Sequence, residues 1–205
     1  MLTVDEYFDT VIEHSTGALV VCALGITNWE WWERTRRKED CFHVNAAMGY
    51  AASVGLGLAL AVPEHTVLVL DSDGGLTMNL SGFTTLAAAK PKNLVHVVAN
   101  NRCYGSLGGT ALVNSAQTDY AAAARACGIE HAVNVETVEQ LDSALRETFS
   151  RGTYGLVVAD IEGPDATRPA DAPLPMPYEA SEMKYIFGRY VEQLTGRSVF
   201  GKLGF

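Results

Sequence analysis

Short apolar runs alternate with longer amphipathic segments along the chain. The runs are rich in valine and leucine and lie at 17–23, 66–71, 94–99, 130–134 and 155–161. Apolar runs this short are typical of strands that a parallel sheet buries on both faces. The segments around them predict helices at 3–14, 29–37, 46–62, 80–89, 117–127, 137–150 and 179–195. The alternation predicts an α/β protein, a three-layer α/β/α fold with a mostly parallel central sheet.

Two local signals support the predicted helices. Thr3 and Glu6 have the spacing of a capping box, in which each side chain binds the backbone amide of the other residue at a helix start. The segment 46–62 is built largely of alanine and glycine, which lets another part of the backbone approach closely.

The length favours a single domain over residues 1–205, because 205 residues, 48% of them hydrophobic, are enough for one full core. A proline-rich stretch at 163–177 precedes the last predicted helix. Its prolines are Pro164, Pro169, Pro173, Pro175 and Pro177. We interpret this stretch as an extended connector to the C-terminal helix and not as a second domain.

The charge and the cysteines restrict the partners and the compartment. The net charge is −9 without a basic cluster, which argues against nucleic acid or an anionic membrane surface as a partner. The run 46–62 is too short and too mixed to span a bilayer. Cys22, Cys41, Cys103 and Cys127 lack the spacing of a metal finger, so we expect reduced thiols. With no secretory signal at the N-terminus, the expected location is cytoplasmic.

Two polar clusters follow neighbouring predicted strands. The first is Asp71-Ser72-Asp73-Gly74-Gly75, and the second is Asn100-Asn101-Arg102-Cys103-Tyr104. Open α/β sheets bind ligands at the carboxyl ends of their strands, so both clusters are expected at one edge. An oxygen ligand from each loop suits Mg²⁺, which takes its remaining ligands from phosphate and water. The sequence therefore predicts a site for a magnesium-bound diphosphate.

This pattern resembles the thiamine-diphosphate motif of the decarboxylase and acetolactate-synthase superfamily. In that motif Gly-Asp-Gly is followed, after a spacer, by Asn-Asn or Asp-Asn; here Ser72 replaces the first glycine. The segments 42–59, 91–94 and 104–109 also resemble the family. The tail 182–190 is similar to the end of the small, or beta, subunit of sulfopyruvate decarboxylase and its phosphonopyruvate decarboxylase relatives.

The resemblance implies roles for particular residues. Asp73, the side chain of Asn101 and the backbone carbonyl of Cys103 would hold Mg²⁺. An ordinary helix N-cap is the alternative for Asp73. The other expected cofactor contacts, some of which could equally form ordinary turns, are Gly25, Ile26, Thr27, Asn28, Ala46, Met48, Ser72, Gly74, Gly75, Tyr104 and Gly105.

Three residues are expected beside the reactive part of the cofactor. In the family a bulky apolar residue holds thiamine in a bent conformation, and the resemblance places it at Met48. The carbonyl of Ala46 would then bind the exocyclic amine, which bending brings close to the C2 proton. His43 would contact substrate or relay a proton. The alternatives are a core methionine at 48 and a structural histidine at 43.

One expected group is missing from the chain. The family needs a glutamate at N1′ of the aminopyrimidine, and it comes from a separate pyrimidine-binding domain. We therefore expect a pyrimidine-binding partner subunit in an α2β2 assembly or a multiple of it. The predicted activity is decarboxylation of a small 2-oxo acid. The alternatives are an acetolactate-synthase-like carboligase subunit and an inactive cofactor-binding or scaffold subunit.

Overall fold

Six strands form one sheet in which every neighbouring pair is parallel, in the order β2-β1-β3-β4-β8-β7. The computed structural model describes residues 1–45, 47–163 and 180–201. The strands of the sheet are β1 (Leu19–Cys22), β2 (Cys41–His43), β3 (Val67–Ser72), β4 (Leu94–Asn100), β7 (His131–Val135) and β8 (Gly155–Asp160). The parallel sheet agrees with the expectation from the apolar runs.

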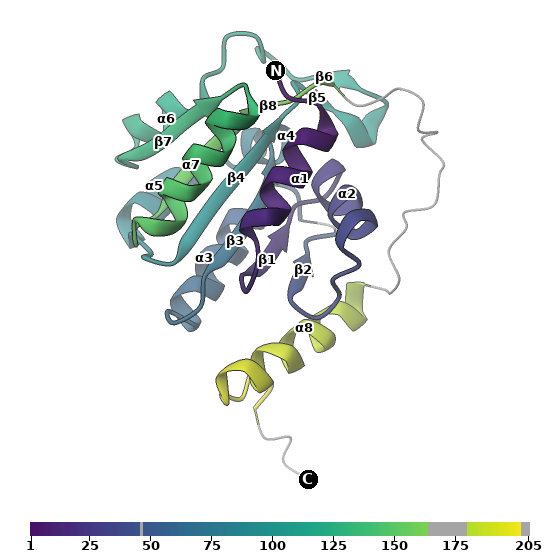
Figure 1. The fold of residues 1–205 in the computed structure, drawn as a ribbon, viewed down its shortest axis with the longest axis vertical. Coiled ribbons are helices and arrows are strands. Elements are labelled where there is room, and N and C mark those ends of the chain that lie inside the picture. The colour runs from purple at the N-terminus through teal and green to yellow at the C-terminus, as the bar shows by residue number, and fades with distance from the viewer. Residues whose placement is uncertain (46, 164–179, 202–205) are drawn as a thin grey trace.

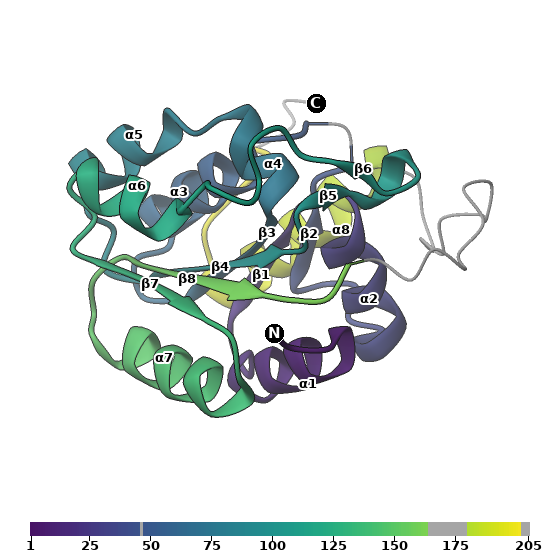
Figure 2. The same cartoon turned by 90° about the horizontal axis from the view of Figure 1, so that it is seen from above.

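Helices cover both faces of the sheet (Figure 1). One face carries α1 (Val4–His14), α2 (Ile26–Thr35) and α7 (Val138–Ser150). The other face carries α3 (Ala51–Ala61), α4 (Asp73–Met78), α5 (Gly82–Ala89), α6 (Tyr120–Ala126) and α8 (Ala180–Thr195). Figure 2 shows α1 and α7 on one side of the sheet and α3, α5 and α6 on the other. The predicted three-layer α/β/α class is confirmed.

Each face of the sheet has its own hydrophobic core. Alternate residues of a strand point to opposite faces. In β4, Val95 and Val97 pack against α1 and α7, whereas Leu94 and Val98 pack against the other helices. All seven residues of β4 are buried, and its two polar side chains, His96 and Asn100, make hydrogen bonds to Tyr154 and Asp160. Burying one such valine or leucine stabilises the fold by about 1.5–3 kcal/mol.

Two predicted local interactions are present. The Thr3 hydroxyl accepts a hydrogen bond from the Glu6 amide, and the Glu6 carboxylate accepts one from the Thr3 amide, so the capping box is complete. In α3, a Cβ added at Gly55 would overlap Cγ2 of Val69. A glycine at this position therefore lets α3 pack tightly on β3, as the small residues predicted.

Several element boundaries differ from the prediction. α3 begins at Ala51 and not at 46, and α2 begins at Ile26. The short strand β2, the helix α4 and an antiparallel ribbon of β5 (Cys103–Tyr104) and β6 (Thr110–Ala111) were not predicted. A 3₁₀ turn, η1 (Gly105–Leu107), joins β5 to β6. These short elements carry too few residues to show a hydrophobic period, so the pattern could not reveal them.

Two expectations stay as they were. The proposed connector lies almost wholly outside the described residues, so it and the single domain over 1–205 remain predictions.

None of the helices in the described ranges is long and apolar enough to cross a bilayer.

Candidate functional site

The strand order changes direction between β1 and β3. β2 lies on one side of β1, and the chain then returns to place β3 on the other side. The two connections leave the sheet in opposite directions, which opens a crevice at the carboxyl ends of β1 and β3; open α/β sheets bind ligands in such a crevice. A pocket lies there, lined by Leu24, Gly25, Ile26, Met48, Ser72, Gly74, Asn101, Cys103, Tyr104 and Gly105.

The turn after β1 presents a helix N-terminus to this pocket. Gly25 is the N-cap of α2 and has φ 108° and ψ −142°, a conformation that is open essentially only to glycine. No side chain of the described residues caps α2, and its first turn holds no acid. Backbone amides at such a terminus attract anions. The turn is therefore suited to a phosphate group.

Two of the four residues predicted in this turn lie behind the pocket. Thr27 and Asn28 are fully buried. The Thr27 hydroxyl donates to the carbonyl of Ala23 (2.8 Å), and the Asn28 amide donates to Oδ1 of Asn45 (2.9 Å). Only Gly25 and Ile26 of this turn line the pocket, and the side chains of Thr27 and Asn28 fix the turn from behind.

The turn after β3 explains how serine replaces the family glycine. Ser72 has φ −121° and ψ 154°, an extended conformation that any residue adopts. It is the N-cap of α4, where its hydroxyl accepts a hydrogen bond from the Gly75 amide (3.2 Å). Asp73 is thus the first residue of α4 and not its cap. The departure from the family motif places no strain on the backbone.

The two glycines of this turn make room for neighbouring groups. A Cβ added at Gly74 would lie 2.8 Å from the ring of Tyr104, and one at Gly75 would lie 2.7 Å from Oδ1 of Asp71. The Gly74 amide donates to Oδ1 of Asp73 (2.8 Å). In this structure the glycines therefore serve close packing, and both amides already have acceptors.

The carboxylate of Asp73 is the strongest candidate for a metal ligand. It has no exposed surface, and Oδ2 accepts a hydrogen bond from the Arg102 amide (2.5 Å). Burial raises the pKa of Asp73 from 3.8 to about 6, although hydrogen bonds from the Gly74 and Arg102 amides lower it. A carboxylate that is costly to ionise gains most from a nearby cation.

The loop after β4 brings a second oxygen to the same place. Asn101 is 9% exposed, and its Oδ1 accepts hydrogen bonds from the Cys103 amide (3.1 Å) and from the Cys103 thiol (3.5 Å), so an ion at this oxygen would displace the weak thiol donor. Burial and the charge of Asp73 raise the pKa of the Cys103 thiol, and the Asp73 carboxylate accepts a hydrogen bond from the amide of the preceding residue, Arg102. Asp73, Asn101 and Cys103 therefore lie near one another at one edge of the sheet.

The side chains of Arg102 and Asn100 hold this loop against Asp160 at the end of β8. Arg102 has φ 61°, and its guanidinium contacts Oδ2 of Asp160 at the end of β8. The Asn100 amide donates to Oδ1 of the same residue (2.6 Å). The sequence did not single out Asp160; its only signal was its place at the end of a predicted strand.

The residues predicted near the reactive carbon differ in their placement. Met48 is half-buried and lines the pocket. Ala46 lies outside the described residues. His43 is fully buried and does not line the pocket; its Nδ1 contacts Oδ1 of Asn28. Among the described residues no partner is found for its Nε2. The structural alternative for His43 agrees with this burial.

The residues present fit a diphosphate held through a divalent cation. Asp73 and Asn101 supply the hard oxygen atoms that Mg²⁺ prefers, and α2 supplies for a phosphate a helix N-terminus that no described side chain caps. A Cβ added at Gly25 would meet no described atom within 4 Å, so there is open space in front of this turn. These groups could neutralise a diphosphate without a basic side chain.

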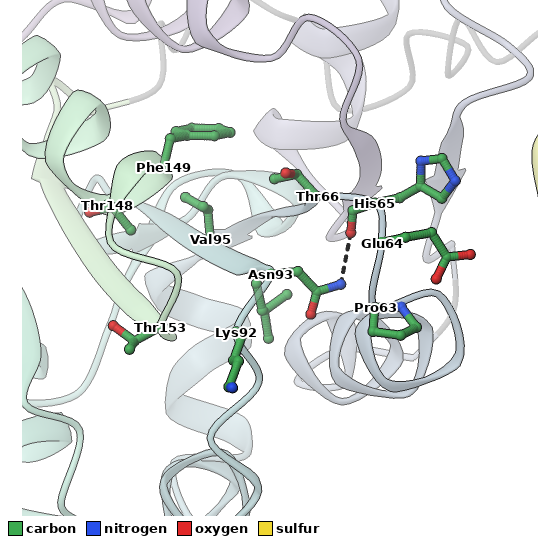
Figure 3. Close-up of a pocket in the computed structure, with 11 residues that line it drawn as sticks. Pro63, Glu64, His65, Thr66, Lys92, Asn93, Val95, Thr148, Phe149 and Thr153 are labelled. Carbon is green, nitrogen blue, oxygen red and sulfur yellow. Dashed lines mark hydrogen bonds between the residues drawn. The ribbon is translucent and has the colours of Figure 1, made fainter.

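A larger hollow lies at the opposite edge of the sheet (Figure 3). It is lined by Pro63, Glu64, His65, Thr66, Lys92, Asn93, Leu94, Val95, Thr148, Phe149 and Thr153. The Asn93 amide donates to the carbonyls of His65 (2.7 Å), Ala59 (3.1 Å) and Val62 (3.1 Å), so it closes the C-terminal end of α3. We assign a structural role to this edge.

Comparisons with known proteins agree with the carboxyl-edge site. Residues 27–161 match the family model for the thiamine pyrophosphate enzyme, C-terminal TPP binding domain. The chain therefore belongs to the thiamine pyrophosphate enzymes, and the matched part is the domain that binds thiamine pyrophosphate, also called thiamine diphosphate. The predicted cofactor is confirmed at the level of the family, whereas the individual site residues stay predictions.

Curated relatives narrow the family. The sulfopyruvate decarboxylase subunit beta of Methanococcus maripaludis is 33% identical over 77% of this chain and 83% of its own length. That of Methanothermobacter thermautotrophicus is 45% identical over 47% of this chain and 54% of its own length. The phosphonopyruvate decarboxylase of Streptomyces hygroscopicus is 39% identical over 62% of this chain, but this match spans only 31% of that enzyme.

The fold is shared with longer enzymes. Benzoylformate decarboxylase from Polynucleobacter necessarius superimposes with a TM-score of 0.63 at 21% identity, over 75% of this chain and 32% of that chain. At this identity the likeness concerns the fold alone. It confirms that the three-layer α/β/α fold also occurs in a larger polypeptide.

Proposed function

We propose that this chain is the diphosphate-binding subunit of a two-chain thiamine-diphosphate-dependent 2-oxo acid decarboxylase. The observation that carries the proposal is the pocket at the carboxyl ends of β1 and β3, where a helix terminus that no described side chain caps meets the side chain of Asn101, with the buried carboxylate of Asp73 next to the pocket residue Gly74. Three relatives named as the beta subunit of sulfopyruvate decarboxylase support a divided enzyme.

The composition of the pocket supports a second chain. None of the described residues that line it is a glutamate, and none is a lysine or an arginine. A partner subunit would supply the glutamate for N1′ of the cofactor and the cations for an anionic substrate. In this proposal the cofactor lies between the two chains of an α2β2 assembly or a multiple of it.

The residues of this chain would bind and orient the cofactor. Asp73, Asn101 and the Cys103 carbonyl would hold Mg²⁺, and the N-terminus of α2 would hold the outer phosphate. Met48, which lines the pocket, would support the cofactor. When bound, thiamine diphosphate supplies the nucleophilic carbon and the electron sink for loss of carbon dioxide.

The relatives suggest the substrate class. Sulfopyruvate and phosphonopyruvate are both pyruvates that carry an additional anionic group, and the named relatives act on one or the other. We propose a substrate of this class for the assembled enzyme. The extended conformation of Ser72 removes the structural reason to favour an inactive scaffold subunit.

The division of the site can be tested with purified chains. The chain would be produced alone and together with its partner, and release of carbon dioxide from sulfopyruvate and phosphonopyruvate would be measured. We expect turnover only from the two chains together. Full turnover by this chain alone would contradict the proposal.

The role of Met48 has its own test. Met48→Ala should slow hydrogen–deuterium exchange at C2 of the cofactor in the assembled enzyme, by roughly tenfold, because the amine is no longer held against C2. Met78→Ala is the matched control, since Met78 is 51% exposed and lies outside the pocket lining. Equal exchange rates in the two variants would remove the proposed role.

A further inference from the structure

Two cysteines and a histidine meet in the core behind the phosphate-binding turn. Cys22 ends β1, and Cys41 and His43 are two residues apart on β2, so both point to the same face. The parallel register places Cys22 beside His43. All three side chains are fully buried, and their ligand atoms lie within 4.8 Å of one another.

The distances between these atoms are those of a metal-binding set. The two Sγ atoms are 3.5 Å apart, and Sγ of Cys41 is 3.9 Å from Nδ1 of His43. Tetrahedral Zn²⁺ with ordinary Zn–S and Zn–N bonds requires about 3.8 Å between two sulfurs and about 3.6 Å between sulfur and nitrogen. These two distances differ from the required values by a few tenths of an ångström, whereas Cys22 and His43, within 4.8 Å of each other, would approach by up to about 1 Å to bring the three atoms around one ion.

A fourth ligand is already beside the histidine. Oδ1 of Asn28 contacts Nδ1 of His43, while the Asn28 amide donates to Asn45. Without an ion, Nδ1 must carry a proton to donate to this oxygen, and Nε2 is then a buried acceptor for which no partner is found among the described residues. Moving the proton to Nε2 would free both the Nδ1 lone pair and Oδ1 of Asn28 to bind an ion.

We propose that Cys22, Cys41, His43 and Asn28 form a structural site for one Zn²⁺ ion. Two thiolates neutralise the two positive charges, so the occupied site would place no net charge in the core. Soft sulfur ligands favour Zn²⁺ over Mg²⁺, which separates this site from the oxygen set of Asp73 and Asn101. The site is closed by protein atoms, as structural zinc sites are.

The ion would join β1, β2 and α2, which strand pairing, hydrogen bonds and packing already hold together. β2 has three residues and lies at the edge of the sheet, and Asn28 belongs to the first turn of α2. Binding requires both thiols to lose their protons: one Zn²⁺ enters, two Zn–S bonds form, and two protons leave. Uptake should therefore strengthen as the pH rises.

The test uses the full chain, reduced, in excess Mg²⁺ so that oxygen sites are filled. Cd²⁺ is titrated in, and the charge-transfer absorption of a cadmium–thiolate bond is recorded, a signal that oxygen ligands cannot give. We expect saturation at one ion per chain and competition by Zn²⁺. Cys22→Ala and Cys41→Ala should lose the signal, whereas Cys127→Ala, which changes a half-buried cysteine outside the cluster, should keep it.

The outcome decides the proposal in each case. Absence of a stoichiometric signal in the wild-type chain, or an unchanged signal in folded Cys22→Ala, would overturn it. Circular dichroism establishes whether the variants fold. If they do not, the wild-type chain decides alone: release of about two protons per ion, measured by calorimetry in buffers of different ionisation enthalpy, supports the site, and no proton release refutes it.

Discussion

The two edges of the sheet differ in what their polar groups do. At the amino edge, the Asn93 amide is used by three backbone carbonyls that end α3 and the turn after it. At the carboxyl edge, a buried carboxylate has a raised pKa, and a helix begins without a side-chain cap among the described residues. The larger hollow is at the amino edge, yet the groups that can take a ligand are at the other.

The difference teaches that chemistry identifies the site better than size. Strand order creates the crevice at the carboxyl edge, and the loops after β1, β3 and β4 place their groups around it. Substitutions at the two edges should therefore separate ligand binding from stability.

Asp73→Ala should give the largest effect on binding. Without this carboxylate the affinity for Mg²⁺ and thiamine diphosphate should fall at least about 100-fold, because a metal ligand is lost outright. Isothermal titration calorimetry on the assembled enzyme measures it. Asp142→Ala, which removes a partly exposed carboxylate on α7, should bind as the wild type does. Unchanged affinity in Asp73→Ala would refute the metal assignment.

Asn93→Ala should affect stability at the amino edge and leave the cofactor affinity of the folded protein unchanged. Three carbonyls lose a donor, so the free energy of unfolding should fall by about 2 kcal/mol in urea denaturation. Asn134→Ala is the control, because Asn134 makes one exposed hydrogen bond, to Asp119. A loss of cofactor affinity in Asn93→Ala would break the separation between the edges.

Gly25→Ala should weaken cofactor binding about tenfold, because alanine resists the backbone conformation that points the α2 amides at the phosphate. Gly152→Ala is a matched control, since Gly152 also has a positive φ (63°) and an added Cβ there would meet no described atom within 4 Å. Both variants should lose stability, but only Gly25→Ala should lose affinity. Equal affinities would show that this turn does not hold the phosphate.

The smallest expected effect is the pH dependence of the metal-free chain. The pKa of Asp73 is about 6 in the folded chain and 3.8 in the unfolded chain, so the folded chain binds more protons between these values. Stability from this group should therefore rise by about 1 kcal/mol as the pH falls from 7.5 to 5. Thermal denaturation with Asp73→Asn as reference measures it.

Mg²⁺ and cofactor should reverse this trend, because they bind the ionised carboxylate. The rise in Tm that they cause should be larger at pH 7.5 than at pH 5. A rise that is independent of pH would mean that Asp73 does not face the ion.

The sequence predicted the buried strands and the placement of the two polar clusters at one edge of the sheet, because both leave simple marks; the role of Asp73 and Asn101 as metal ligands stays a prediction. Each strand begins with an apolar run, which His96 interrupts in β4, and each polar cluster begins at the last residues of its strand. The cluster residues Asn101, Cys103 and Tyr104 do line the pocket with Ser72 and Gly74.

Other features depend on contacts between distant segments and could not be predicted. β2 is defined by its pairing with β1, and the burial of His43 by its place on that strand. The glycines at 74 and 75 are explained by Tyr104 and Asp71, which only the folded chain brings near. Cys41 and His43 at alternate positions were a signal for the cysteine–histidine cluster, but Cys22 joins them only through the sheet.

The most direct test of the central claim is a crystal structure of the two-chain enzyme with thiamine diphosphate and Mg²⁺. We predict an ion about 2.1 Å from oxygen atoms of Asp73 and Asn101, with a phosphate at the start of α2 and the partner chain over Met48. A cofactor bound elsewhere, or an ion without Asp73 among its ligands, would contradict the account.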